Sequence, residues 1–166
     1  MAGQARAPLK LGSYIRIQGA VAAVLNAIIN PALAWLLNRK MEAVALGDVA
    51  VDAAVTSLCV SLLVALCAAP GARRAVRSGQ LADLEGAGRE AWLRRLPSKS
   101  WALGLLFGAC ATVLLVLVIL GAFRLAGLPG LSFPGFAVLK AVYTGILGYA
   151  VTRWVILRQV LAVTPP

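Results

Sequence analysis

The chain has 166 residues, of which 61% are hydrophobic and 13% are charged, and its mean hydropathy is +0.87. A soluble domain is about half apolar and about a quarter charged, so this composition excludes an ordinary water-soluble domain and indicates a membrane protein. The net charge of +10 does not indicate nucleic-acid binding, because the basic residues flank apolar stretches and no DNA- or RNA-binding motif accompanies them.

Four stretches of the chain are apolar and reach the length of about 20 residues that a transmembrane helix needs. They cover residues 14–37, 44–69, 101–125 and 133–157. The first stretch is longer than the apolar part of a signal peptide and contains two asparagines, so we expect it to be retained. The chain is therefore predicted to be an all-α membrane protein with four transmembrane helices.

Basic residues are distributed unevenly between the connections, and this predicts the orientation in the membrane. Twelve of the 16 lie at the amino terminus, between residues 70 and 100, or at the carboxyl end. Three are assigned to the other side: Arg39, Lys40 and Arg124. Both termini are therefore predicted to be cytoplasmic. The chain divides into a first transmembrane hairpin (1–69), a basic cytoplasmic loop (70–100) and a second hairpin (101–166).

The loop 70–100 contains apolar residues at helical spacing among its arginines. These residues are Leu81, Leu84, Gly88, Trp92 and Leu96. The pattern predicts a short amphipathic helix that lies on the anionic lipids of the inner leaflet. The alternative is a solvated linker whose positive charge only fixes the topology.

Two pairs of segments match at nearly the same offset, which indicates an internal repeat. At an offset of 88, three residue types recur, and Asp52 falls opposite Lys140. The matching pairs are Gly47 with Gly135, Ala53 with Ala141, and Thr56 with Thr144. At an offset of 89, residues 19–25 match residues 108–114. The two hairpins are predicted to be parallel repeats related by an axis along the membrane normal, with chance similarity between apolar helices as the alternative.

Polar side chains inside the spans are few and are concentrated on three of the four helices. The first span carries Asn26 and Asn30, the second Asp48, Asp52 and Thr56, and the fourth Lys140 and Thr144. Within each span these residues are four apart, so they share a helix face. Asp52 and Lys140 also lie at equal depth in the outer half of the bilayer. Because a charge at the centre of a transmembrane helix costs about 2.5–3.5 kcal/mol, we expect these two side chains to pair or to share an aqueous cavity.

Two interpretations of these seven residues stay open. The functional one is a binding site for an ion or small solute, open toward the outside, in which Asp52 carries a proton. The structural one is a buried ion pair between Asp52 and Lys140 that fixes the helix register. In that case the asparagines are interhelical contacts and Asp48 belongs to the outer interface.

Three classes of function fit these features to different degrees. The polar residues, the predicted repeat and a helix bend at Pro31 favour a small transporter or channel subunit. A non-transporting scaffold or accessory subunit of a larger complex is the alternative, supported by small-residue faces such as that of Gly104 and Gly108. A membrane enzyme ranks third, because the sequence offers no convincing nucleophile and no metal-ligand set.

The remaining expectations concern assembly, cofactors and location. Four helices make a thin bundle, so we expect a homo-oligomer or a larger complex. The chain has no histidine, and Cys59, Cys67 and Cys110 form no CxxC pair, so they are interpreted as small buried apolar residues, and no cofactor or metal is expected. The alanine- and glycine-rich composition is typical of a high-GC bacterial genome, which predicts a location in the bacterial inner membrane.

Overall fold

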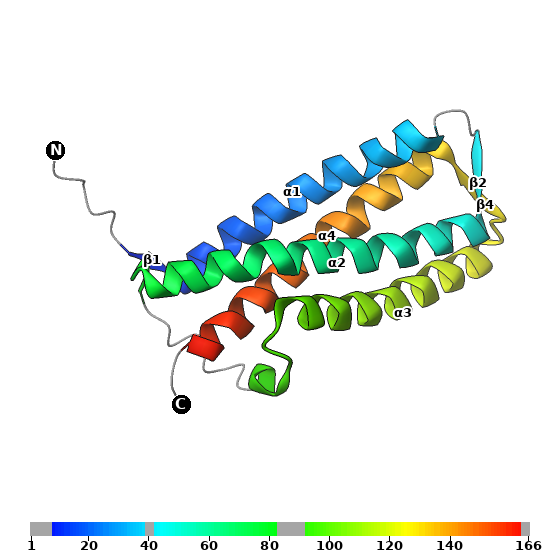
Figure 1. Ribbon diagram of the computed structural model, residues 1–166. Coiled ribbons are helices and arrows are strands. Elements are labelled where there is room, and N and C mark those ends of the chain that lie inside the picture. Colours follow the sequence, from blue (N-terminus) through cyan, green and yellow to red (C-terminus); the bar gives the residue numbers. More distant parts are fainter. Residues whose placement is uncertain (1–7, 39–41, 83–91, 164–166) are drawn as a thin grey trace, which may run out of the picture.

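The computed structural model describes residues 8–38, 42–82 and 92–163, and four long helices dominate it (Figure 1). The helices are α1 (Leu11–Asn38), α2 (Leu46–Arg77), α3 (Ser100–Ala126) and α4 (Phe133–Val163). Each contains a stretch long and apolar enough to cross a membrane. The prediction of a helical chain with four helices of membrane-spanning length and composition is therefore confirmed.

Two of the helices continue past their predicted ends, both at the basic end of the bundle. Helix α2 was expected to stop at Ala69 but runs through Pro70 to Arg77, and α4 passes Leu157 to reach Val163. Hydropathy marks where apolar surface ends, whereas alanine and arginine continue a helix readily in a polar environment. Helix α2 stops only at Ser78, where the following Gly79 adopts a positive φ of 68°.

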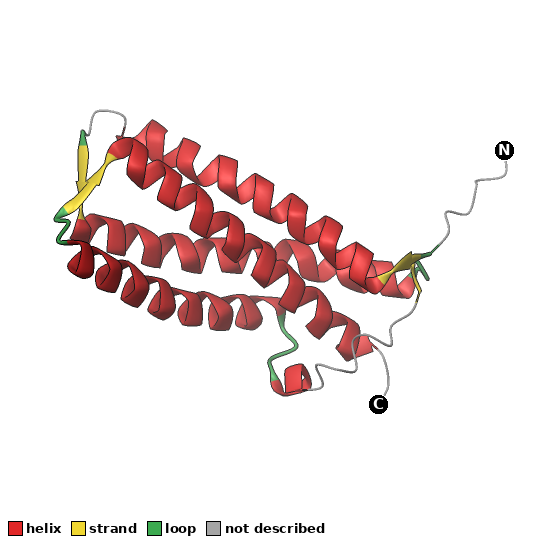
Figure 2. Ribbon diagram, turned by 180° about the vertical axis from the view of Figure 1, so that it is seen from behind, coloured by secondary structure: helices red, strands yellow, loops and turns green. Residues whose placement is uncertain are grey.

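The four helices pack in an order that differs from their order in the chain (Figures 1 and 2). Helix α1 packs along α4, α3 packs along α2, and α2 and α4 contact each other in the middle of the bundle. Sequence neighbours α1 and α2 share few contacts, as do α3 and α4. Helix α4 is therefore the most buried helix, and α1 exposes most of its apolar surface.

Small residues allow the closest helix contacts. A Cβ on Gly104 would lie only 2.9 Å from the Cα of Leu62, and a Cβ on Gly108 would lie 3.1 Å from the Cα of Leu58. Helix α3 thus approaches the backbone of α2 more closely than a larger side chain would permit. The contact face expected from the two glycines lies against α2 of the same chain.

Short strands join the connections at both ends of the bundle, and the sequence did not predict them. At one end β2 (Ala43–Ala45) pairs antiparallel with β4 (Gly130–Ser132), so Val44, expected to begin the second span, lies in a strand. At the other end β1 (Leu9–Lys10) pairs with β3 (Leu81–Ala82). We call these the ribbon end and the basic end; α1 begins and α4 finishes at the basic end.

The amphipathic helix expected in the loop 70–100 falls mainly on residues 83–91, which lie outside the described residues. Of the residues that defined the pattern, Leu81 belongs to β3, and residues 92–95 form a single 3₁₀ turn. Leu93 in this turn is fully buried in a cluster with the ends of α1, α2 and α4. The described ends of the loop therefore pack onto the bundle.

The three cysteines do not lie where they were expected. Cys59, Cys67 and Cys110 are all exposed on the outside of the helices rather than buried between them. Inside the bundle the close contacts are made by glycine, alanine and serine, because their smaller side chains let the backbones approach. The cysteines instead contribute to the apolar exterior.

Candidate functional site

Asp52 of α2 and Lys140 of α4 form an ion pair between the two central helices. The ammonium Nζ of Lys140 lies 2.5 Å from Oδ1 of Asp52 and donates a second hydrogen bond of 3.1 Å to the hydroxyl of Thr56. The Lys140 side chain is 7% exposed and that of Asp52 is 29% exposed. Thr56 follows Asp52 by one helical turn, which puts both acceptors on the face that meets α4.

Tyr143 completes this group of side chains, and the sequence analysis did not identify it. Its hydroxyl donates a 3.2 Å hydrogen bond to the other carboxylate oxygen of Asp52, and the residue is buried. Tyr143 stands three residues after Lys140, so the same face of α4 carries both. We call Asp52, Thr56, Lys140 and Tyr143 the central polar cluster.

An aromatic ring covers Lys140 on its other side. The ammonium lies 5.6 Å from the centre of the Phe136 ring, which precedes Lys140 by one turn of α4 and is itself buried. An ammonium over an aromatic face is attracted by the ring quadrupole, and this attraction strengthens where water is excluded. Lys140 is therefore held by a carboxylate, a hydroxyl and a ring.

The cluster lies nearer to the ribbon end than to the basic end. Asp52 is six residues beyond the start of α2 at Leu46, and Lys140 is seven residues beyond the start of α4 at Phe133. At 1.5 Å per residue, both charges lie about 9–10 Å along their helices from the ribbon end. The equal depth expected from the sequence follows from this geometry.

The side chains of the predicted residues of α1, Asn26 and Asn30, donate hydrogen bonds within their own helix, and Asn26 also contacts α4. Asn26 donates to the carbonyl of Ala22, and Asn30 donates to the backbone and side-chain oxygens of Asn26. Thr144 bridges the helices, because its hydroxyl lies 3.0 Å from the carbonyl oxygen of Asn26 and 2.7 Å from that of Lys140. The structure thus joins Asn26 of α1 to Thr144, one turn after Lys140 on α4, and Asn30 to Asn26.

Asp48 lies apart from the pair. It is exposed in the first turn of α2, one turn nearer to the ribbon end than Asp52. A carboxylate in the first turn interacts favourably with the positive end of the helix dipole. The structure therefore brings together Asp52, Thr56 and Lys140 directly, and leaves Asp48 at the helix start.

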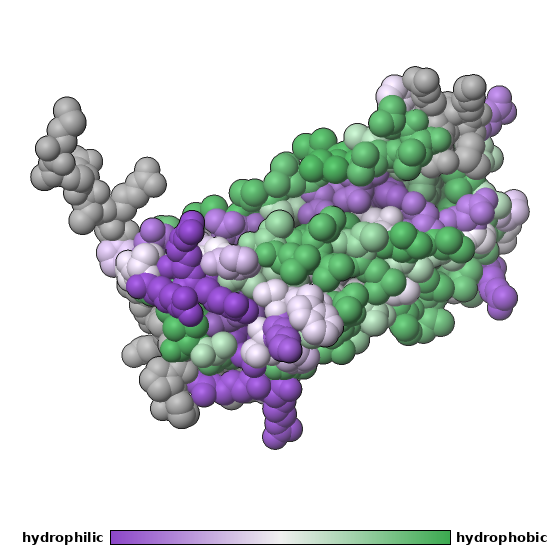
Figure 3. All heavy atoms as spheres, viewed as in Figure 1, coloured by the Kyte–Doolittle hydropathy of each residue, from purple (hydrophilic) through white to green (hydrophobic). Residues whose placement is uncertain are grey.

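A groove separates α1 from α2 above α4. Toward the ribbon end, Figure 3 shows a hydrophilic band between these two helices, with apolar surface on both sides of it. A cavity of about 320 Å³ lies between them, with Gln18, Asn26 and Thr152 as its polar lining and apolar residues of α1 and α2 as its walls. The contacts between α1 and α2 are few, so the central helices are partly accessible from this side.

Metal ligands are not gathered anywhere in the described ranges 8–38, 42–82 and 92–163. No group of three or more histidine, cysteine, aspartate or glutamate side chains is placed there to hold an ion. The chemistry of the central polar cluster is that of a carboxylate, an ammonium and two hydroxyls. Such a group can exchange protons and bind small ions or polar solutes.

Four apolar helices of spanning length, with charged side chains paired between them, indicate an integral membrane protein. Comparison with known proteins does not narrow this class. No protein-family model matches the chain, and neither the curated proteins nor the solved structures give a match.

Proposed function

We propose that this chain is a small membrane transporter or channel subunit for an ion or small solute, with its site at the central polar cluster. The observation that carries the proposal is the pairing of Lys140 with Asp52 between two apolar spans. Charged residues inside a membrane are expensive, and those that occur commonly mark ion or proton pathways. The apolar residues of the two central helices would pack without such a pair.

The different exposure of the two charges gives them different roles. Asp52 is partly exposed, whereas Lys140 is nearly enclosed by Asp52, Thr56 and Phe136. In the proposed cycle a proton from water binds the Asp52 carboxylate and neutralises it, which releases the ammonium of Lys140 from its counter-ion. The site then attracts an anion or a polar solute, and the pair re-forms when the solute leaves and Asp52 loses its proton. Asp52 is thus the proton acceptor and Lys140 the solute-binding group.

The helix contacts support a repeat of the two hairpins. Exchanging α1 with α3 and α2 with α4 turns the α1–α4 contact into the α3–α2 contact and leaves the α2–α4 contact unchanged. Individual contacts follow the same exchange. Gly19 of α1 faces Tyr149 of α4, and Gly108 of α3 faces Ser61 of α2. Gly108 corresponds to Gly19 at the offset of 89, and Tyr149 corresponds to Ser61 at the offset of 88. We therefore propose parallel repeats related by an axis along the membrane normal, with the ion pair beside this axis.

The charge distribution supports an orientation. Most basic residues belong to the end of the bundle where α1 begins and α4 finishes, and this end is strongly hydrophilic in Figure 3. Basic connections stay in the cytoplasm, so both termini are proposed to be cytoplasmic, with the ribbon end outside. In a bacterium this corresponds to the inner membrane.

The proposal is tested by flux through proteoliposomes. Purified protein is reconstituted into vesicles that contain a pH-sensitive dye, and proton entry is followed after a potassium gradient with valinomycin sets the membrane potential. Potassium, sodium and chloride fluxes are measured in parallel vesicles. We expect wild-type vesicles to carry flux and Asp52→Asn vesicles to lose it at least about tenfold, as expected for an essential proton carrier.

The control variant is Asp48→Asn, which removes the same charge one turn away and is expected to leave flux unchanged. Both variants must elute with the wild-type oligomer in detergent. Wild-type vesicles that are no more permeable than empty ones, or an Asp52→Asn variant with full flux, would contradict the proposal.

The groove favours a second candidate, a non-transporting scaffold or accessory subunit. Gln18 and Asn26 line a cavity that faces out between α1 and α2, and polar groups in hydrocarbon are stabilised by a partner helix. In a scaffold or accessory subunit, a helix of a different protein would cover this cavity. Extraction in a mild detergent followed by mass measurement separates these cases: a homo-oligomer agrees with the transporter, and a stable complex with a different protein agrees with the scaffold.

A further inference from the structure

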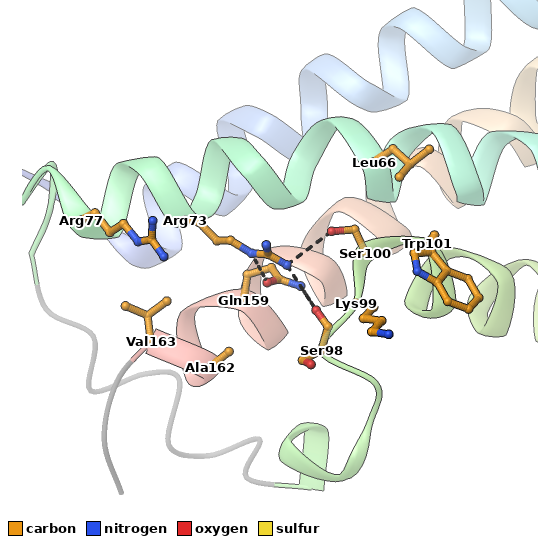
Figure 4. A pocket seen from close by; sticks show the side chains of 10 residues that line it. All are labelled: Leu66, Arg73, Arg77, Ser98, Lys99, Ser100, Trp101, Gln159, Ala162 and Val163. Carbon is orange, nitrogen blue, oxygen red and sulfur yellow. Dashed lines mark hydrogen bonds between the residues drawn. The ribbon is translucent and has the colours of Figure 1, made fainter.

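The basic end contains a second pocket, outside the central polar cluster, where α2, α4 and the start of α3 meet (Figure 4). Its volume is about 550 Å³. The lining residues that matter here are Leu66, Arg73, Arg77, Lys99, Ser100 and Trp101. We call this cavity the basic pocket.

Arg73 is fixed at the centre of the basic pocket. Its Nε donates a 2.7 Å hydrogen bond to Gln159, and its Nη2 donates to the carbonyl of Ser98 and the hydroxyl of Ser100 (Figure 4). Gln159 is itself 1% exposed and donates to the same Ser98 carbonyl. A guanidinium has five N–H donors, so these three bonds orient it and leave two for a ligand. A fixed arginine loses little side-chain entropy when it binds an anion.

Two further cations flank Arg73, one on each side. Arg77 and Lys99 are exposed, and Figure 4 shows them on opposite sides of the Arg73 guanidinium. The carboxylates of the described ranges lie toward the other end of the bundle: the nearest along α2, Asp52, precedes Arg73 by 21 residues, or about 31 Å. The pocket therefore presents positive charge that no described carboxylate neutralises.

The start of α3 adds hydrogen-bond donors to this charge. The helix begins at Ser100, and Lys99 at its N-cap position makes no side-chain capping bond. The first N–H groups of a helix lack partners within it and attract anions, phosphate above all. Arginine and helix N–H groups together form a phosphate site, because a phosphate accepts several hydrogen bonds at once.

The other wall of the basic pocket is apolar. Leu66 and Trp101 are 44% and 52% exposed and lie where the apolar surface of the spans begins. Tryptophan prefers this interfacial level of a bilayer. A free phosphate ion would contact only the cationic side, whereas a phospholipid would place its phosphate on the arginines and its glycerol and first methylene groups against the apolar wall.

We propose that the basic pocket binds the headgroup of one anionic phospholipid from the leaflet at the basic end. This inference goes beyond the proposed transport function and does not depend on it. The lipid phosphate contacts Arg73, Arg77, Lys99 and the first turn of α3. One bound lipid thereby joins the basic ends of α2 and α3.

The test compares lipid retention by matched variants. Protein is incubated in detergent with phosphatidylglycerol or phosphatidylcholine, and bound lipid is counted by native mass spectrometry. The pocket variant Arg77→Gln/Lys99→Gln removes two exposed charges and keeps the Arg73 hydrogen bonds. The control variant Lys10→Gln/Arg95→Gln removes two exposed charges from the same end but outside the pocket.

We expect the first phosphatidylglycerol to bind the wild type and the control variant alike, and to bind the pocket variant at least about tenfold more weakly. Phosphatidylcholine is expected to bind none of them at this site. Equal loss in both double variants would overturn the proposal, because attraction by the whole basic end would then explain retention.

A second measurement separates lipid from soluble phosphate. Trp101→Ala is expected to weaken phosphatidylglycerol binding by removing the apolar wall, and millimolar inorganic phosphate is expected not to displace the bound lipid. Displacement by inorganic phosphate would show that the pocket takes a soluble anion, and full retention in Trp101→Ala would show that the apolar wall does not contribute. Either result would overturn the assignment to a lipid.

Discussion

At the scale of single residues, the central feature is the ion pair between Asp52 and Lys140. Bringing two charges into an apolar bundle costs several kcal/mol per ion, and mutual attraction with good hydrogen bonds offsets that cost. Here the geometry supplies those bonds from Thr56 and Tyr143. A pair of this kind stabilises the fold little compared with apolar side chains, but loss of one partner leaves the other charge without compensation.

Replacing Lys140 alone should therefore destabilise the protein more than replacing both charges. We predict that Lys140→Met lowers the free energy of unfolding by about 3 kcal/mol, and that adding Asp52→Asn recovers most of this loss. Reversible unfolding in mixed detergent micelles measures both values. Asp52→Asn alone is measured as well. If the losses of stability in Lys140→Met and Asp52→Asn simply add in the double variant, the two side chains do not interact.

The Tyr143 hydroxyl should also contribute through its bond to Asp52. Tyr143→Phe removes one hydrogen bond to a carboxylate, and we expect it to lower the free energy of unfolding by about 1.5 kcal/mol. Tyr149→Phe on the same helix is the control. The Tyr149 ring packs against Gly19, and this variant keeps the ring, so loss of the Tyr149 hydroxyl should change the free energy of unfolding little. An equal effect of both variants would argue against the bond to Asp52.

At the scale of elements, the contact between α2 and α3 depends on two glycines. Gly104 lies against the backbone of α2, whereas a Cβ on Gly121 of the same helix would enter open space. We predict that Gly104→Ala lowers the free energy of unfolding by about 1–3 kcal/mol through overpacking, and that Gly121→Ala raises it slightly through better helix propensity. Thermal unfolding in detergent measures both signs. Two variants of equal stability would contradict the close α2–α3 packing.

The spans could be predicted from the sequence because apolar length alone identifies them. The order of packing could not be predicted, because all faces of an apolar helix are similarly hydrophobic and none indicates a particular neighbour. In the structure α1 lies along α4 rather than along its sequence neighbour α2. The continuation of α2 through Pro70 was also missed, because an apolar stretch ends before its helix does. The strands β2 and β4, in which Val44 pairs with Leu131, could not be predicted either, because three residues are too few to show an alternating pattern.

The candidate site was partly predictable for a related reason. Asp52 and Lys140 stand out because charge is rare in apolar helices. Helical spacing grouped Thr56 with Asp52, and the structure shows that Thr56 accepts a hydrogen bond from Lys140. Tyr143 was missed because a tyrosine in an apolar helix carries no comparable signal, although its position three residues after Lys140 places it on the same face. The spacing of four residues grouped Asp48 with Asp52, but Asp48 lies one turn nearer to the start of α2, where its side chain is exposed.

At the scale of the whole molecule, the two ends differ in charge, and this difference makes the orientation testable. Cys59, Cys67 and Cys110 are exposed on the apolar exterior, so they can be replaced by alanine without opening a cavity. Single cysteines are then introduced as Ser78→Cys at the basic end or Ser132→Cys at the ribbon end, both exposed. A membrane-impermeant maleimide should label Ser132→Cys in intact bacterial cells and Ser78→Cys only after lysis. The reverse pattern would contradict cytoplasmic termini.

The claim that the central polar cluster forms a transport site is tested most directly by flux through Asp52→Asn/Lys140→Met. This double variant lacks both charges and leaves no charge uncompensated, so it should fold and assemble like the wild type. We predict that its vesicles are no more permeable than empty vesicles, while wild-type vesicles carry flux. If the double variant carries the wild-type flux, the pair only holds the helices together, and the transport site lies elsewhere.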